Sequence, residues 1–143
     1  MGKLFKLQCS KCDFTKTVCE GSTRLLANEF ITVSCDACCS IENRSYDFPE
    51  NCPVRPEPGT GWWGRKNRQK ELNDRYLTES AHWNAEMDKR RVEALQQPCS
   101  QCVSAVQSVH FGDPFIEPIP IGIGCPACKC QGCMNVALEA LID

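Results

Sequence analysis

The feature of this sequence that most constrains its fold is a repeated pattern of paired cysteines. Two residues separate the cysteines of each pair, and 22 residues separate the two pairs in each half of the chain. The pairs of the second half follow those of the first half at a constant offset of 90 residues. A shared spacer and a constant offset indicate the duplication of one module. The eight positions are Cys9, Cys12, Cys35, Cys38, Cys99, Cys102, Cys125 and Cys128.

Cysteine pairs at this spacing are typical of zinc sites with four thiolate ligands. A two-residue spacer allows a tight turn to aim both sulfurs at one ion. A module of about thirty residues buries too little surface to fold alone, so the metal would supply much of its stability. We therefore predict two zinc ions, one at Cys9/Cys12/Cys35/Cys38 and one at Cys99/Cys102/Cys125/Cys128. Disulfides or free thiols are the alternative to a metal, and iron is the alternative to zinc.

Both quartets resemble zinc ribbons of the rubredoxin-like class, with Cys9-Ser-Lys-Cys12 and Cys35-Asp-Ala-Cys38 in one and Cys99-Ser-Gln-Cys102 and Cys125-Pro-Ala-Cys128 in the other. The resemblance covers about thirty residues near each end of the chain and none of the middle. It implies a small three-stranded module that is widely used as an interaction or nucleic-acid-binding attachment. The chain departs from the usual pattern after each pair, where Asp13, Cys39, Val103 and Lys129 stand in place of a glycine.

Five cysteines lie outside these quartets. Cys130-Gln-Gly-Cys133 forms a fifth pair, which competes with Cys125 and Cys128 for the second metal. We favour Cys125 and Cys128, because the repeat predicts them and a proline suits the turn between them. The remaining three, Cys19, Cys39 and Cys52, have no pair partner, and we interpret them as small buried hydrophobic residues.

Short strand-like segments flank the cysteine pairs at residues 3–8, 14–18, 30–33, 103–111 and 119–123. Pro118 and Pro120 lack N–H donors, so the last of these strands should lie at the edge of a sheet. Residues 134–142 place Met134, Ala137, Leu138 and Leu141 on one face of a helix, which predicts a terminal helix.

The middle of the chain contains two segments that differ in amino-acid composition. Residues 49–64 are rich in proline and glycine, which indicates a linker. Residues 65–97 contain neither and predict a long charged helix that Pro98 ends. The predicted fold is a small metal-stabilised α+β protein, in which two zinc-ribbon β modules (1–48 and 98–143) are joined by this helix.

Candidate partner-binding residues lie where the linker meets the helix. Trp62 and Trp63 precede Arg65 and Lys66, a combination suited to a protein partner or to stacking on unpaired bases. The net charge is −2, and residues 99–143 carry one Lys/Arg against four Asp/Glu, which disfavours nucleic acid. An apolar seam on the helix makes a homodimer possible, through Leu72, Tyr76, Trp83, Met87 and Leu95.

The remaining signals concern compartment and chemistry. The opening residues do not read as a secretory signal, and thirteen cysteines cannot all pair, so we expect a reducing, cytoplasmic setting and no membrane span. The sequence contains no phosphate-binding loop, nucleophile elbow or zinc-protease motif. The sequence thus predicts a non-catalytic zinc-binding adaptor. The alternatives are a nucleic-acid-binding accessory protein and a thiol or iron redox protein.

Overall fold

The computed structural model describes residues 2–23, 27–57, 64–112 and 117–142. The chain divides into two compact units. The first unit comprises Met1–Asp47 with Val92–Asp143, and the second comprises Phe48–Arg91. All eight cysteines of the repeated pairs belong to the first unit.

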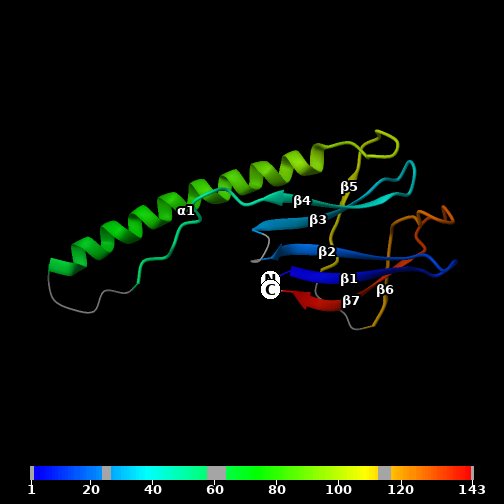
Figure 1. Ribbon diagram of the computed structural model, residues 1–143, viewed down its shortest axis with the longest axis horizontal. Helices are drawn as coiled ribbons and strands as arrows, with labels where there is room; N and C mark the ends of the chain where they lie inside the picture. Colours follow the sequence, from blue (N-terminus) through cyan, green and yellow to red (C-terminus); the bar gives the residue numbers. More distant parts are fainter. Residues whose placement is uncertain (1, 24–26, 58–63, 113–116, 143) are drawn as a thin grey trace. The chain divides into compact units, whose positions relative to one another are not determined.

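The first unit is built on one seven-stranded sheet (Figure 1). Its strands run in the order β4-β3-β2-β1-β7-β6, and β5 pairs with β3 beside this path. All pairings are antiparallel. The strands are β1 (Gly2–Cys9), β2 (Thr15–Thr23), β3 (Asn28–Ser34), β4 (Ile41–Asp47), β5 (Gln107–Val109), β6 (Ile119–Ile121) and β7 (Met134–Ile142).

This sheet shows that the predicted architecture of two separate ribbons joined by a helix is wrong. The last strand of the chain, β7, pairs with the first, from Gly2 opposite Ile142 to Cys9 opposite Met134. In the same way β5 pairs with β3, with Thr32 opposite Val109. Strands from both ends of the chain therefore share one sheet. A single sheet buries more apolar surface than two ribbons of about thirty residues each, which favours the merged arrangement.

The predicted terminal helix at residues 134–142 is also wrong, because this segment forms strand β7. Met134 is fully buried and Leu141 is 56% exposed, although helical periodicity had placed both on one face. Burial instead alternates at the start of the strand, where Met134 and Val136 are buried and Asn135 between them is less so. The backbone groups of this segment are satisfied by β1, so pairing overrides the helical pattern.

The core of the first unit lies around β1, β2 and β7. Phe5 of β1 packs against Phe111 with ring centroids 4.7 Å apart. Strand β6, which contains Pro120 and follows Pro118, lies at the edge of the sheet, which confirms that prediction. The buried cluster includes Phe5, Leu7, Cys9, Val18, Ile41, Val109, Phe111, Cys125, Cys133, Met134 and Val136. Two cysteines of the repeated pairs thus form part of the core itself.

Helix α1 (Gly64–Gln96) occupies the stretch predicted to be helical. Its last residues belong to the first unit, where Ala94 is buried. The helix has no basic residue in its last turn. Arg44 of β4 supplies the cation, and its guanidinium donates to the carbonyl oxygens of Ala94 at 2.8 Å, Gln97 at 2.7 Å and Pro98 at 3.0 Å. These contacts satisfy acceptors that a helix end leaves unpaired.

The second unit consists of most of α1 and the extended segment that precedes it. The Trp83 ring packs edge-on against Phe48, and its Nε1 donates to the Pro49 carbonyl at 3.2 Å. Elsewhere the helix is largely solvated, with Leu72 43% and Leu77 63% exposed. Of the seam predicted from the sequence, Tyr76, Trp83, Met87 and Leu95 are half-buried and Leu72 is not. Among the described residues, no helix is long and apolar enough to cross a membrane.

Candidate metal centres

The eight cysteines of the repeated pairs gather into two groups of four. The first centre contains Cys9, Cys12, Cys125 and Cys128, and the second centre contains Cys35, Cys38, Cys99 and Cys102. The four sulfurs of each centre lie within 4.8 Å of one another, so each centre could hold a metal ion. The composition of the two centres differs from the predicted quartets. Each centre takes one pair from each half of the chain, because strand pairing brings distant segments together.

Strand pairing explains which pairs meet. Because Cys9 stands opposite Met134 at the end of β1, the first pair lies beside the segment that leads into β7. The Ser10 amide donates to the Cys133 carbonyl at 2.8 Å and extends this pairing past the strand. At the other centre, Ser34 stands opposite Gln107, which places the pair after β3 beside the segment before β5. Compared with the repeat in the sequence, the two copies of the module have exchanged their second cysteine pairs.

All four cysteine pairs adopt the same local turn, which we call the knuckle. In each knuckle the amide of the first cysteine donates to the carbonyl five residues later. The distances are 3.0 Å for Cys9 to Phe14, 2.9 Å for Cys35 to Ser40, 2.8 Å for Cys99 to Ser104 and 3.0 Å for Cys125 to Cys130. This hydrogen bond joins residues only five positions apart, and it is present in the knuckles of both centres.

The residue after the second cysteine carries the strain of the knuckle. Its φ is positive in three of the four knuckles, at 56° for Cys39, 60° for Val103 and 59° for Lys129. Glycine adopts this left-handed region without penalty, whereas residues with a Cβ do not. The residues that stand in place of glycine at these three positions therefore destabilise the folded state. The destabilisation is largest at Val103, because a β-branched residue is least tolerant of this conformation.

The sulfur spacing fits a tetrahedral ion. A Zn–S bond of about 2.3 Å gives tetrahedral S···S edges of about 3.8 Å. In the first centre Cys9 Sγ lies 3.7 Å from Cys128 Sγ, and Cys12 Sγ lies 3.7 Å from Cys125 Sγ. In the second centre the corresponding distances are 3.4 Å for Cys35 to Cys102 and 3.5 Å for Cys38 to Cys99. Each centre is thus close to the size that a four-thiolate zinc site requires.

Backbone and hydroxyl donors point at the sulfurs. The amides of Lys11 and Gln101 lie 3.3 Å and 3.4 Å from the Sγ atoms of Cys9 and Cys99, respectively. In the second centre the side-chain hydroxyls of Ser40 and Ser104, followed by their amides, lower the pKa values of Cys38 and Cys102. Such donors stabilise the thiolate, which is the form that binds metal. The two serines hold equivalent positions, one in each knuckle of the second centre.

The second centre is braced by a half-buried charge network. Glu42 of β4 accepts hydrogen bonds from the Ser100 amide and hydroxyl, both at 2.8 Å, and pairs with Arg44 at 2.7 Å. Burial opposes ionisation of Glu42, but these donors outweigh it and lower its pKa to about 2. Since Arg44 also binds the end of α1, the network joins β4, the helix end and the knuckle that begins at Cys99.

The first centre has a fifth cysteine beside it. Cys133 Sγ lies 3.4 Å from Cys9 Sγ, and the side chain is 5% exposed. Burial raises the pKa of Cys133, and its thiol donates to the Cys130 carbonyl at 2.9 Å. Cys130 and Cys133, the alternative metal ligands from the sequence, do not replace Cys125 and Cys128 in the four-cysteine group.

The two centres contact one another through the segment after Gly124. Lys129 Nζ donates to the Cys38 carbonyl at 2.7 Å, and Gln131 Nε2 lies 3.2 Å from Cys39 Sγ. A Cβ on Gly124 would come within 2.7 Å of Cys39 Sγ. These contacts join a knuckle of the first centre to a knuckle of the second, so a change at one centre can be transmitted to the other.

The remaining cysteines have different surroundings. Cys19 and Cys39 are buried, each 7% exposed, which confirms the interpretation as small hydrophobic residues. Burial, and then the nearby Glu20 carboxylate, raise the pKa of Cys19. Cys52 is exposed, so the same interpretation is wrong there.

The candidate partner-binding residues are not characterised by the structure. Trp62 and Trp63 lie outside the described residues. Arg65 and Lys66 fall within α1, but their side chains are also outside the described part of the chain.

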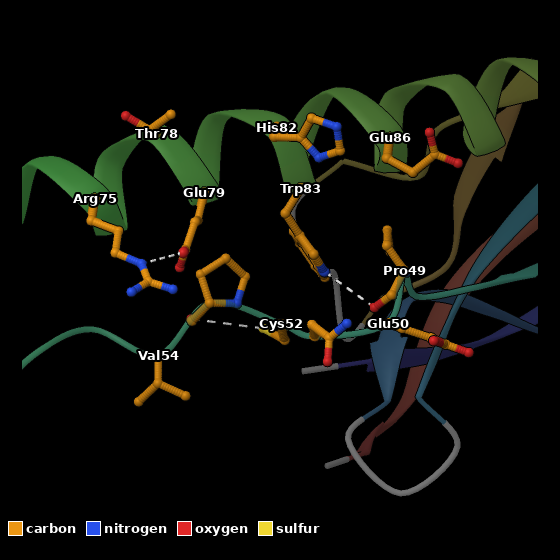
Figure 2. A pocket seen from close by; sticks show the side chains of 12 residues that line it. Pro49, Glu50, Cys52, Val54, Arg75, Thr78, Glu79, His82, Trp83 and Glu86 are labelled. Atoms are coloured by element: carbon orange, nitrogen blue, oxygen red, sulfur yellow. Dashed lines mark hydrogen bonds and ion pairs between the residues drawn. The ribbon is translucent and has the colours of Figure 1, made fainter.

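The second unit contains a groove of about 810 Å³ between α1 and the preceding segment (Figure 2). Trp83 points from the helix across it to the backbone of Pro49, and Arg75 pairs with Glu79 at 2.7 Å on the helix side. Cys52 lines the groove, whereas the cysteines of the two centres do not. Its lining mixes proline, carboxylate and amide groups and defines no particular chemistry.

Comparison of the chain with models of protein families, with characterised proteins and with solved structures finds no match. The fold and the geometry of the two centres therefore carry the functional argument.

Proposed function

We propose that this chain is a non-catalytic zinc-binding adaptor, in which two four-cysteine centres stabilise the first unit and the second unit binds a protein partner. The observation that carries the proposal is the gathering of eight cysteines into two groups of tetrahedral size. Four thiolates fill the coordination positions of zinc and leave none for a water or a substrate. Closed sites of this kind are structural, whereas catalytic zinc sites keep one position open.

The choice of zinc over iron rests on the same chemistry. Four thiolates bind either metal, but a closed structural centre needs no redox change. Elemental analysis and native mass spectrometry of the purified protein test this point. We expect two zinc ions per chain. Two iron ions would place the protein with the redox alternative, and a metal-free protein with intact disulfides would overturn the proposal.

The adaptor role is supported by the surface of the second unit. The apolar side chains of Leu72 and Leu77 are exposed on a helix that is otherwise strongly charged. The segment Trp62, Trp63, Arg65 and Lys66 stands at the start of this helix in the sequence. Aromatic and arginine side chains dominate the energetics of protein interfaces. We therefore propose a protein partner, bound through these four residues.

A nucleic-acid partner is the alternative, and salt distinguishes the two. Phosphate neutralisation makes affinity fall steeply as salt rises, whereas apolar burial does not. We expect no tight binding of DNA or RNA at physiological salt. Submicromolar, salt-sensitive binding of a single strand, abolished by Arg65→Glu with Lys66→Glu, would move the protein to the nucleic-acid class. A Trp62→Ala, Trp63→Ala variant should keep both metals and lose its protein partner.

The apolar seam predicted on α1 gives a second interaction to test, a homodimer through this helix. Met87 is half-buried on the helix and belongs to the predicted seam. If the seam joins two copies, sedimentation should show dissociation on dilution, and Met87→Lys should shift the equilibrium to the monomer. A protein that stays monomeric at high concentration would contradict this pairing and leave the metal centres unaffected.

A further inference from the structure

We propose that Cys133 is an exchangeable fifth ligand of the first centre, able to take the place of Cys128 on the metal. The inference rests on the proposed function, because it assumes that the first centre binds zinc. It extends that function from a fixed structural ion to one whose ligand set can change. In the second centre, built from the same knuckle, the sulfur–sulfur contacts found among the described residues are those between the four cysteines themselves.

The first argument is distance. Cys9 Sγ has two sulfur neighbours from the C-terminal half, Cys128 at 3.7 Å and Cys133 at 3.4 Å. Both distances are close to the tetrahedral S···S edge of about 3.8 Å around a zinc ion. Cys133 is therefore as near to Cys9 as Cys128 is, but it stands outside the group of four sulfurs that lie within 4.8 Å of one another, so its side chain must turn toward the ion to bind it.

The second argument is that the backbone holds Cys133 in place. The Cys133 carbonyl accepts hydrogen bonds from the Ser10 amide at 2.8 Å and the Ser10 hydroxyl at 3.1 Å. The next residue, Met134, is fully buried and stands opposite Cys9 in the sheet. Cys128, in contrast, is exposed to solvent. The spare thiol is thus anchored beside the centre, and the ligand that it would replace is the accessible one.

The third argument is the comparison with the second centre. In the 90-residue repeat, Cys99 corresponds to Cys9 and Cys38 corresponds to Cys128. Cys38 Sγ lies 3.5 Å from Cys99 Sγ, much as Cys128 lies from Cys9. The extra neighbour of Cys99, however, is the hydroxyl of Ser40 at 3.0 Å. Thiolates bind zinc readily, whereas a neutral hydroxyl does not replace them.

The exchange balances in bonds and protons. The Cys133 thiol would give up its hydrogen bond to the Cys130 carbonyl and release its proton to solvent, and the resulting thiolate would bind the metal. The Cys128 thiolate leaves the metal and takes up one proton from solvent. Four thiolates surround the ion before and after, so the charge of the centre does not change. No oxidant or reductant is required.

The test compares serine variants of the full chain loaded with zinc. Native mass spectrometry gives the number of ions, competition with a chelator gives affinity, and the absorption of the Co²⁺-substituted protein gives the number of thiolates per ion. A fixed ligand supplies about a quarter of the binding free energy of such a site, so its loss costs about 100-fold or more in affinity. We expect this loss at the second centre in the matched control Cys38→Ser.

For Cys128→Ser we expect the first centre to keep its ion with four thiolates and to lose less than about 10-fold in affinity, since a comparable thiol takes over. Cys128→Ser with Cys133→Ser should fall as far as the control. A loss in Cys128→Ser equal to that in Cys38→Ser, or a centre with only three thiolates, would overturn the exchange while leaving two zinc ions in the unmodified protein. A metal-free unmodified protein would instead refute the proposed function itself.

Discussion

The first and second centres use the same knuckle and nearly the same sulfur spacing, yet their surroundings differ. The second centre has the hydroxyls of Ser40 and Ser104 beside its sulfurs, and the Glu42–Arg44 ion pair connects its Cys99 knuckle to the end of α1. The first centre instead lies against the hydrophobic core and a fifth thiol, Cys133. The comparison teaches that a duplicated metal-binding motif can yield one braced centre and one adaptable centre. The neighbours, and not the ligands, make the difference.

The variant with the largest expected loss of stability tests whether the two centres are independent of each other. Cys99 is 1% exposed, and Cys99→Ser removes a ligand of the second centre. Two self-contained ribbons would leave the other half folded. In the shared sheet we expect the free energy of unfolding of the first unit to fall by about 3 kcal/mol or more. Thermal unfolding followed by circular dichroism measures this.

The control for this prediction is Cys52→Ser, since Cys52 is exposed and outside both centres. It should leave the transition unchanged. Loss of one metal without any change in the melting of the rest of the unit would show that the centres are independent, contrary to the shared sheet.

The contact between the centres is tested by Gly124→Ala. The added methyl group would meet Cys39 Sγ at 2.7 Å and Gln131 Oε1 at 3.0 Å, so the buried Cys39 side chain must move. We expect a destabilisation of about 2 kcal/mol, as for other overpacked sites. Chemical denaturation measures it, and the zinc affinity of both centres should fall together. Gly122→Ala is the matched control, because no described atom lies within 4 Å of its added Cβ.

The bracing of the second centre is tested by Glu42→Gln. The variant loses a charge-assisted pair with Arg44 and weakens the hydrogen bonds from Ser100. We expect a destabilisation of about 1.5 kcal/mol, together with weaker zinc binding at the second centre only. Denaturant titration and metal competition check the two effects. Equal weakening of both centres would contradict the localised role of this network.

The pH dependence of that effect follows from the lowered pKa of Glu42. A carboxylate whose folded pKa is about 2 contributes stability above its unfolded pKa, and this contribution is lost as pH falls toward 2. The difference between the original protein and Glu42→Gln should therefore be the same at pH 8 and pH 5.5. A difference that shrinks already between these values would show that Glu42 is not held ionised.

The smallest expected effect concerns the strain in the knuckles. Val103 is 77% exposed and has a φ of 60°, so Val103→Gly removes strain without losing buried surface. We expect a stabilisation of about 0.5 kcal/mol, the difference between the relieved strain and the entropy of glycine in the unfolded chain. Asp13→Gly is the control. Asp13 is the equivalent residue of the first knuckle and lies outside the left-handed region, so that variant should destabilise slightly.

Some features of the two centres could be predicted from the sequence, and others could not, for physical reasons. Sequence analysis found the cysteine pairs because their spacing is a local requirement of the knuckle. It missed Glu42 and Arg44, because their role depends on β4 lying beside Ser100 and the end of α1. The serines of the second centre left a detectable signal, since Ser40 and Ser104 each stand five residues after the first cysteine of a pair.

In the fold, too, features set by local sequence could be predicted, and those set by distant pairing partners could not. The absence of glycine and proline was enough to predict α1, and Pro118 and Pro120 were enough to predict an edge strand. Residues 134–142 have a pattern compatible with either a helix or a strand, and only the backbone donors and acceptors of β1 select the strand. The sequence-based choice was wrong because periodicity over nine residues is too short to decide against an available pairing partner.

By itself the sequence determined four cysteine knuckles, their arrangement as a duplicated set and the helix between them, because each depends on residues close together in the chain. Only the tertiary structure decided which knuckles share a centre. Four equivalent pairs can combine in more than one way with the same local geometry. Pairing of β1 with β7 and of β3 with β5 makes one combination possible, because it buries a common core and fixes the ends of those strands side by side.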